Sequence, residues 1–344
     1  MERCREARGS RAAGECHVHL PAWRRAAMNG HKPDFADLLT LDSVDRDIFR
    51  GLCHAGAPMR AFGGQVAAQA QVAAGRTVDP DRRMHSLHGY FLRPGRTDSP
   101  IVYLVERIRD GRSFTTRRVS AVQNGETIFS MSASFQLPRD AEETHQLRAP
   151  DVPGPENLPR WWEPIDEAPE FRPFLLIDIR SPRGLGGRAG RTEASRATDG
   201  TGRATGSPEA AGSAGSAGSA TGGPPAAPES TPDDGMPRQN VWVRVDQTLP
   251  DDPLLHVCAL TYLSDLTLSS TAYLPYAGLP GRLDIVSLDH AMWFHRPFRA
   301  DDWLLFAQDS PSAGGGRGLS RGVFFNQDGQ AVASAIQEAG LFRR

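Results

Sequence analysis

Residues 88–136 read HGYFLRPGRTDSPIVYLVERIRDGRSFTTRRVSAVQNGETIFSMSASFQ, and residues 290–340 repeat this pattern as HAMWFHRPFRADDWLLFAQDSPSAGGGRGLSRGVFFNQDGQAVASAIQEAG. The two stretches align with almost no gaps. The aligned pairs include Phe91 with Phe294, Arg93 with Arg296, Pro94 with Pro297, and the Asn124-Gly125 turn with Asp328-Gly329. We therefore predict that the chain contains two versions of one domain.

The two copies differ at a position that bears on chemistry. Gln337 in the second copy aligns with Ala133 in the first, so a buried-strand amide in one copy is replaced by a methyl group in the other. This asymmetry predicts one working site, in the second copy, and one that has lost its function.

The pattern around each copy predicts an α+β fold, in which an antiparallel sheet curves around one central helix. Residues 62–76, FGGQVAAQAQVAAGR, are small or apolar on every face, which is typical of a buried helix. A second helix is expected after Asp252, which can cap it, with Pro253 in the first helical position. Strands are expected near 90, 104, 118 and 131 in the first half and at 173–180, 240–247 and near 287, 305, 322 and 334 in the second.

These segments divide the chain into parts. The predicted parts are a disordered N-terminal extension at 1–33, a domain at 34–147, a connection at 148–170 and a domain at 171–344. The second domain carries an insert at about 183–237, which is too poor in apolar side chains to build a core and is expected to be a disordered loop. Such an insert is tolerable because closure entropy grows only with the logarithm of loop length.

Composition excludes several classes of function. The 344 residues carry a formal net charge of only -2, so no global basic field attracts nucleic acid or an anionic membrane. The 4 cysteines have no paired or CxxC spacing, which argues against a disulfide framework and a zinc site and favours a reducing, cytoplasmic location. No apolar run approaches the ~20 residues of a membrane span.

Several motifs resemble one known family. FGGQ, HSLHGYFLRPG, RDGRSFTTRRVSAVQNG, YLSD, LDHAMWFHRPF, ADDWLLF and VASAIQEAG are similar, in this order, to the motifs of the type II acyl-CoA thioesterases, the TesB-like double hotdog enzymes. The resemblance covers nearly all of residues 36–344 apart from the insert. It implies two tandem hotdog folds that form a pseudo-dimer within one chain, and the hydrolysis of acyl-CoA to free acid and CoA without a cofactor.

The resemblance also implies a catalytic site in the second hotdog. Its aspartate corresponds to Asp265 in YLSD, its hydroxyl to Ser287 in IVSLDH, and its amide to Gln337 in SAIQEAG. Asp265 could accept a proton from water, while Ser287 and Gln337 orient that water by neutral hydrogen bonds. The oxyanion would be held by a backbone N–H, expected where the second central helix meets its flanking loop. Ser287 stands where the family usually has threonine, so a hydroxyl is retained without the β-branch that restricts χ1.

Other polar residues are weaker candidates. Arg317, beside the SAGGGRG turn, and Trp293 are candidates for binding CoA and the acyl chain. His85, His88, His290 and His295 lie in strand-like segments, where histidine is more often packed or hydrogen-bonded than catalytic. Taken singly, Asp265 could be a helix cap, Ser287 a surface hydroxyl and Gln337 a buried amide.

Two other functions remain open from the sequence. A hotdog enoyl-CoA hydratase would share the fold, but the expected DxxxxNPxH motif is absent. A noncatalytic acyl-CoA-binding protein could dispense with the acid, hydroxyl and amide, all of which are present. Because exposed sheet edges favour pairing, we also expect a homodimer or a higher even-numbered assembly.

Overall fold

The computed structural model describes residues 34–54, 60–139, 144–161, 176–182, 235–277 and 283–343. The predicted N-terminal extension and most of the predicted insert lie outside these residues. The last residues of that insert, 235–237, are described, and the backbone N–H of Ser310 donates to the Pro237 carbonyl at 3.0 Å.

The first half of the chain forms a six-stranded antiparallel sheet around one long helix. Its strands run in the order β1-β2-β4-β5-β6-β3. Its elements are α2 (Phe35–Leu38), β1 (Asp42–Asp45), β2 (Ile48–Gly51), α3 (Gly63–Gly75), β3 (Arg83–Phe91), β4 (Ile101–Asp110), β5 (Phe114–Gln123) and β6 (Glu126–Gln136).

The second half repeats this arrangement in the order β10-β13-β12-β11-β8-β7, and β9 pairs with the far end of β13. A short helix, η1 (Pro155–Asn157), lies between the halves. The elements of the second half are β7 (Ile177–Arg180), β8 (Arg238–Val245), α4 (Pro253–Ser264), α5 (Leu268–Thr271), η3 (Leu274–Tyr276), β9 (Leu283–Ser287), β10 (Asp289–Phe294), β11 (Leu304–Gly314), β12 (Arg317–Phe325) and β13 (Ala331–Arg343).

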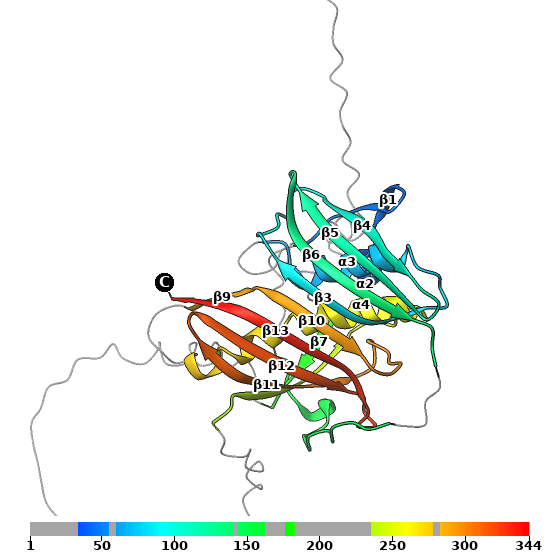
Figure 1. Cartoon of the computed structure of the whole chain (residues 1–344). Coiled ribbons are helices and arrows are strands. Elements are labelled where there is room, and N and C mark those ends of the chain that lie inside the picture. The colour runs from blue at the N-terminus through cyan, green and yellow to red at the C-terminus, as the bar shows by residue number, and fades with distance from the viewer. Residues whose placement is uncertain are drawn as a thin grey trace, which may run out of the picture.

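The two sheets join into one through the antiparallel pairing of β3 with β10, in which His88 lies opposite Ala291. Figure 1 shows the two halves meeting along this seam, with the helices α3 and α4 next to one another. The added Cβ of Gly75, at the end of α3, would meet Leu254, in the first turn of α4. The helices are therefore antiparallel, and the predicted α+β fold of two hotdog units packed as a pseudo-dimer is confirmed.

The residues of the two long helices explain why both are enclosed. Five of the ten buried positions of α3 are alanines, whose small side chains let the helix approach both its own sheet and α4 closely. The expected cap of α4 is present, since Asp252 Oδ1 accepts from the Leu254 N–H at 2.9 Å and Pro253 begins the helix.

Matching hydrogen bonds from an arginine side chain to a backbone carbonyl fix the equivalence of the two halves. Arg93 Nη1 donates to the Thr127 carbonyl, and in the second half Arg296 Nη1 donates to the Ala331 carbonyl. This pairing makes Ala133 the structural counterpart of Gln337, because each lies six residues further along the same strand. The alignment that set these two residues against one another is confirmed in three dimensions.

The connection between the halves covers the outer face of the second sheet. Trp242, Leu305 and Phe325 form a small apolar cluster there, against which Val152 and Leu158 pack. Trp242 Nε1 also donates to the Pro153 carbonyl at 2.9 Å. The inner face of this sheet thus packs against the helices, and the candidate site lies on that side.

Candidate active site

Asp265 lies at the C-cap of α4, where the helix ends and the chain turns towards α5. The antiparallel packing brings the N-terminus of α3 to this point from the other half of the chain. The backbone N–H of Gly64 donates to the Asp265 carboxylate, and a Cβ on Gly63 would lie 3.0 Å from Asp265 Oδ2. Both glycines belong to the FGGQ motif, and a carboxylate at a helix N-terminus is electrostatically favoured.

Ser287 and Gln337 complete the cluster from the sheet. Gln337 Nε2 donates to Asp265 Oδ1 at 2.8 Å and to Ser287 Oγ at 2.8 Å. The Ser287 hydroxyl also hydrogen-bonds the Asp265 carboxylate. Gln337 is fully buried, whereas Ser287 and Asp265 keep part of their surface accessible. The three side chains expected from the sequence therefore meet, and the cluster opens on the side of Ser287 and Asp265.

Burial controls the electrostatics of the cluster. It raises the pKa of the Asp265 carboxyl to about 6, and the hydrogen bonds from Gln337, Gly64 and Ser287 hold the pKa below what burial alone would give. Asp265 is thus mostly ionised at neutral pH, yet basic enough to accept a proton. A carboxylate with this pKa, beside two neutral donors, is suited to activating a water molecule.

A break in the strand presents Ser287 to the cluster. Leu288 separates β9 from β10, and its N–H donates to the Glu338 carbonyl at 2.9 Å. Asp289 Oδ1 accepts from the Glu338 N–H at 2.7 Å, which braces the break from the other side. Burial raises the pKa of the Asp289 carboxyl.

The corresponding region of the first half has none of these groups. Arg76 is the C-cap residue of α3, as Asp265 is of α4. Met84 is the counterpart of Ser287, because Met84 pairs with Phe135 in the first half and Ser287 pairs with Ala339 in the second. Ala133 takes the place of Gln337. Arg117 lies opposite Ala133, and its buried guanidinium donates to the Thr77 carbonyl and to Asp110 at 2.9 and 2.6 Å.

Arg317 and Trp293 are not brought into contact with this cluster. Arg317 is exposed, and its Nε donates to Glu338 Oε1 at 3.0 Å on the outward face of the sheet. Trp293 packs edge-to-face against His88 at the seam, with ring centroids 5.0 Å apart. Their roles in substrate binding remain predictions without a contact to support them.

Two features of the site were missed by sequence reasoning. The helix N-terminus beside Asp265 is that of α3, in the first half, and its Gly64 N–H donates to the carboxylate. The oxyanion donor expected near the second central helix stays a prediction. His54, also in the first half, contacts the second half of the chain: its Nε2 lies 2.8 Å from the Tyr262 hydroxyl. FGGQ was the available signal for the first feature, but its partner lies about two hundred residues away in sequence.

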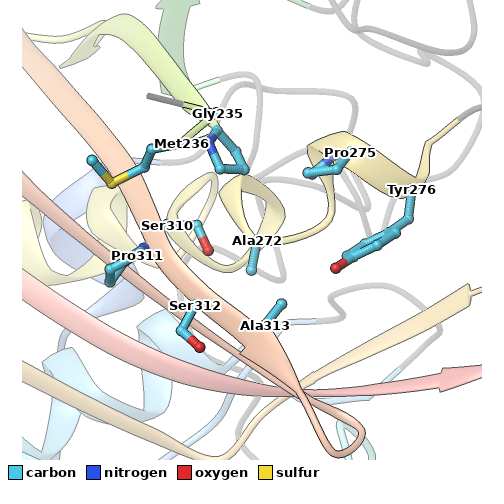
Figure 2. A pocket seen from close by; sticks show the side chains of 10 residues that line it. Gly235, Met236, Ala272, Pro275, Tyr276, Ser310, Pro311, Ser312 and Ala313 are labelled. Atoms are coloured by element: carbon cyan, nitrogen blue, oxygen red, sulfur yellow. The ribbon is translucent and has the colours of Figure 1, made fainter. Parts of the chain in front are cut away.

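A separate cavity of about 350 Å³ lies beside η3 and β11 (Figure 2). It is lined by Gly235, Met236, Pro237, Ala272, Pro275, Tyr276 and residues 310–313. Neither Asp265, Ser287 nor Gln337 reaches it, and Tyr276 is the one side chain in its lining that ionises. The cavity is therefore separate from the Asp265 cluster.

Two absences apply to the part of the chain that the structure describes. Within it, no group of three or more histidine, cysteine, aspartate or glutamate side chains is placed to hold a metal ion. Among the same residues, no helix combines the length and apolar character needed to cross a membrane.

Known proteins resemble both halves of the chain. Residues 54–136 match the family described as acyl-CoA thioesterase N-terminal domain, and residues 228–341 match acyl-CoA thioesterase. Acyl-coenzyme A thioesterase 8 of Homo sapiens is 36% identical over 307 residues, which cover 89% of this chain and 88% of the relative. Acyl-CoA thioesterase 2 of Haemophilus influenzae is 34% identical over 322 residues, covering 89% and 96%.

Solved structures agree with these relatives. The acyl-CoA thioesterase II TesB2 of Mycobacterium marinum has a TM-score of 0.69 and 42% identity, covering 90% of this chain and 99% of that chain. A hot dog fold protein from Alicyclobacillus acidocaldarius, with a TM-score of 0.63 and 20% identity, supports the fold alone. The fold and the Asp265 cluster define a fused double hotdog protein with one polar site at its seam. The chain belongs to the acyl-CoA thioesterase family.

Proposed function

We propose that this protein hydrolyses acyl-CoA thioesters, with Asp265 as the general base. The observation that carries the proposal is the convergence of Asp265, Ser287 and Gln337, with Gln337 Nε2 at 2.8 Å from an oxygen of each partner. These groups supply one proton acceptor and two neutral orienting groups at the same point. This combination suits the hydrolysis of a thioester, because its leaving group is good and delivery of water is the difficult step.

The reaction follows from these roles. Asp265 takes a proton from a water molecule that Ser287 orients, while Gln337 holds both of these side chains in place, and the water oxygen attacks the thioester carbonyl carbon. The carbonyl oxygen becomes an oxyanion, which the dipole of α3 stabilises at the N-terminus of this helix. When the tetrahedral intermediate collapses, the C–S bond breaks, and the thiolate of CoA leaves and takes up the proton from Asp265.

The two halves of the chain have different tasks in this proposal. The second half supplies the base and both orienting groups, and the first half supplies the helix N-terminus at Gly63 and Gly64. The first half has no second site of its own, since Met84 and Ala133 stand where Ser287 and Gln337 stand in the other half. One chain would therefore turn over one thioester at a time.

A direct assay tests the function. The purified protein is mixed with an acyl-CoA and a thiol reagent, and we expect continuous release of free CoA thiol. A noncatalytic acyl-CoA-binding protein would release none, and a hydratase would remove the conjugated double bond of an enoyl-CoA without releasing thiol. Either result would rule out hydrolysis.

We also infer a reducing, cytoplasmic location. Cys53 and Cys258 are free and buried, and burial raises the pKa of both thiols well above their usual range, so neither is reactive. Cell fractionation with an antibody to the protein tests this inference, and recovery in a secreted or organellar fraction would contradict it.

A further inference from the structure

His290 is a buried histidine that the proposed reaction does not use. It lies in β10 and is 1% exposed, and its Nε2 is 2.8 Å from Ser264 Oγ, on the last residue of α4. The strand register pairs Ala291 with Ile336, so His290 is the next residue along β10, beside Gln337 on β13. His290 therefore links the end of α4 to the amide of the active site.

The hydrogen bonds of Gln337 leave one atom that needs a donor. Both hydrogens of Nε2 are committed, one to Asp265 and the other to Ser287. Gln337 Oε1 and His290 Nδ1 are both shielded from solvent, and neither is hydrogen-bonded to any other described group. A buried amide oxygen without a donor is costly, and the neighbouring imidazole can supply the missing N–H.

The charge state of His290 agrees with this role. Burial lowers the pKa of His290 to about 4, while the adjacent Gln337 amide acts in the opposite direction. The imidazole is therefore neutral at physiological pH and has one N–H. If that hydrogen is on Nδ1, it faces Gln337 Oε1. Nε2 then accepts the Ser264 hydroxyl proton, which turns to it from the Thr261 carbonyl, 2.8 Å from Ser264 Oγ.

The first half of the chain lacks the whole arrangement. Leu87 lies opposite Ala133 in the β3–β6 pairing, so these two apolar residues take the places of His290 and Gln337. Gly75 ends α3 where Ser264 ends α4. The histidine, the serine and the amide are thus present together in one half and absent together from the other, which links them to the working site.

We propose that His290 is a positioning residue, whose Nδ1–H donates to Gln337 Oε1 and so holds the amide nitrogen towards Asp265 and Ser287. This inference rests on the proposed function. Without that donor the amide could flip, and its oxygen would then face the Asp265 carboxylate. Asp265 and Ser287 would lose the donor that holds them in place, so the chemical step would slow while substrate binding stayed nearly the same.

Kinetics of four variants test the proposal. His290→Leu introduces the residue of the inactive half, and we expect kcat to fall about 10-fold or more with KM within about 2-fold. His290→Asn places an amide N–H near the position of Nδ1 and should recover much of this loss. Gln337→Ala should lower kcat itself, and adding His290→Leu to it should cause no further fall, because the histidine acts through the amide.

The outcomes separate this inference from the proposed function. If Gln337→Ala leaves kcat unchanged, the site assignment itself fails. If Gln337→Ala lowers kcat but His290→Leu does not, or if the two losses multiply in the double variant, only the role of His290 is overturned. His295→Asn is the matched control, since His295 also contacts a serine, Ser334 at 2.8 Å, but is exposed and outside the site.

A measurement on the unaltered protein keeps the test valid if a His290 variant does not fold. Nitrogen-15 NMR of the histidine side chains identifies the tautomer of His290. The His290 signal is assigned by its loss in His290→Asn or, if that variant does not fold, by assigning the other histidines through their own variants. We expect the proton on Nδ1 at neutral pH. A proton on Nε2 would overturn the proposal, because Nδ1 would then have nothing to donate.

Discussion

A single carboxylate, Asp265, determines how the site depends on pH. Burial raises its pKa to about 6, and a general base works only when it is deprotonated. We therefore expect kcat/KM to be constant near pH 7.5 and to fall tenfold per pH unit well below pH 6. Steady-state rates measured from the loss of thioester absorbance between pH 4.5 and 8 give the apparent pKa. A limb centred near pH 4 would mean that Asp265 is not the buried base.

The three side chains of the proposed site could be predicted from the sequence because each belongs to a short motif in a fixed order. Their surroundings could not be predicted in the same way. The contact of Gly64 with Asp265 depends on the antiparallel packing of two helices from different halves, which no local pattern encodes. For the same reason no local pattern predicted that a backbone N–H of the first helix donates to the Asp265 carboxylate.

Among the elements, α3 is the one that the proposed site shares between the halves. A methyl group on Gly63 would lie 3.0 Å from Asp265 Oδ2 and 3.0 Å from the Phe91 ring, so the carboxylate or the helix must move. We expect Gly63→Ala to lower kcat by about 10- to 100-fold with a smaller change in KM, because misplacement of reacting groups slows the chemical step. Gly314→Ala is the matched control, since nothing lies within 4 Å of its added Cβ.

The strands and long helices could be predicted from period and turn chemistry, but their interruptions could not. Asn124 and Gly125 have positive φ values of 52° and 81°, as the hairpin prediction required. The strand expected near 287 is instead two strands separated at Leu288, and the reason is a tertiary hydrogen bond from the Glu338 N–H to Asp289. That break is what presents Ser287 to the site.

The insert between β7 and β8 tests which elements the activity needs. Arg180 lies opposite Trp242, and Ser181 Oγ donates to the Asn240 carbonyl at 3.3 Å, so the insert leaves and re-enters the fold at adjacent strands. Replacing residues 184–234 with a short turn should leave kcat/KM within about 2-fold, because closure entropy depends weakly on length. A large loss of kcat with an unchanged circular dichroism spectrum would indicate that the insert contacts substrate.

At the scale of the whole molecule, both edges of the fused sheet are less open than the sequence indicated. The N–H of Trp161 donates to the Ile179 carbonyl at 2.7 Å along β7, and β1 is short and carries Asp42 and Asp45. A homodimer or higher even-numbered assembly therefore remains a prediction, and an outward face with exposed Ile108 and Phe114 is the more suitable surface for it.

Light scattering after size exclusion tests this assembly. We expect a mass that is an even multiple of the mass of one chain. The mass should shift towards that of the single chain when Ile108 and Phe114 are both changed to lysine. A monomer with full activity at nanomolar concentration would contradict the prediction, and it would leave the pairing of the two halves within one chain unaffected.

The central claim is that Asp265 is the base of an acyl-CoA hydrolase, and Asp265→Asn tests it most directly. The amide keeps the size of the side chain and can still accept from Gln337, so the fold should persist. The raised pKa means that the ionised Asp265 carboxylate lowers the stability of the folded protein above pH 6. At pH 8 the variant should therefore unfold at the same temperature as the unaltered protein or at a higher one. The account predicts that kcat for acyl-CoA falls by at least ~100-fold in this folded variant. Hydrolysis at a rate within a few-fold of the unaltered protein would contradict it.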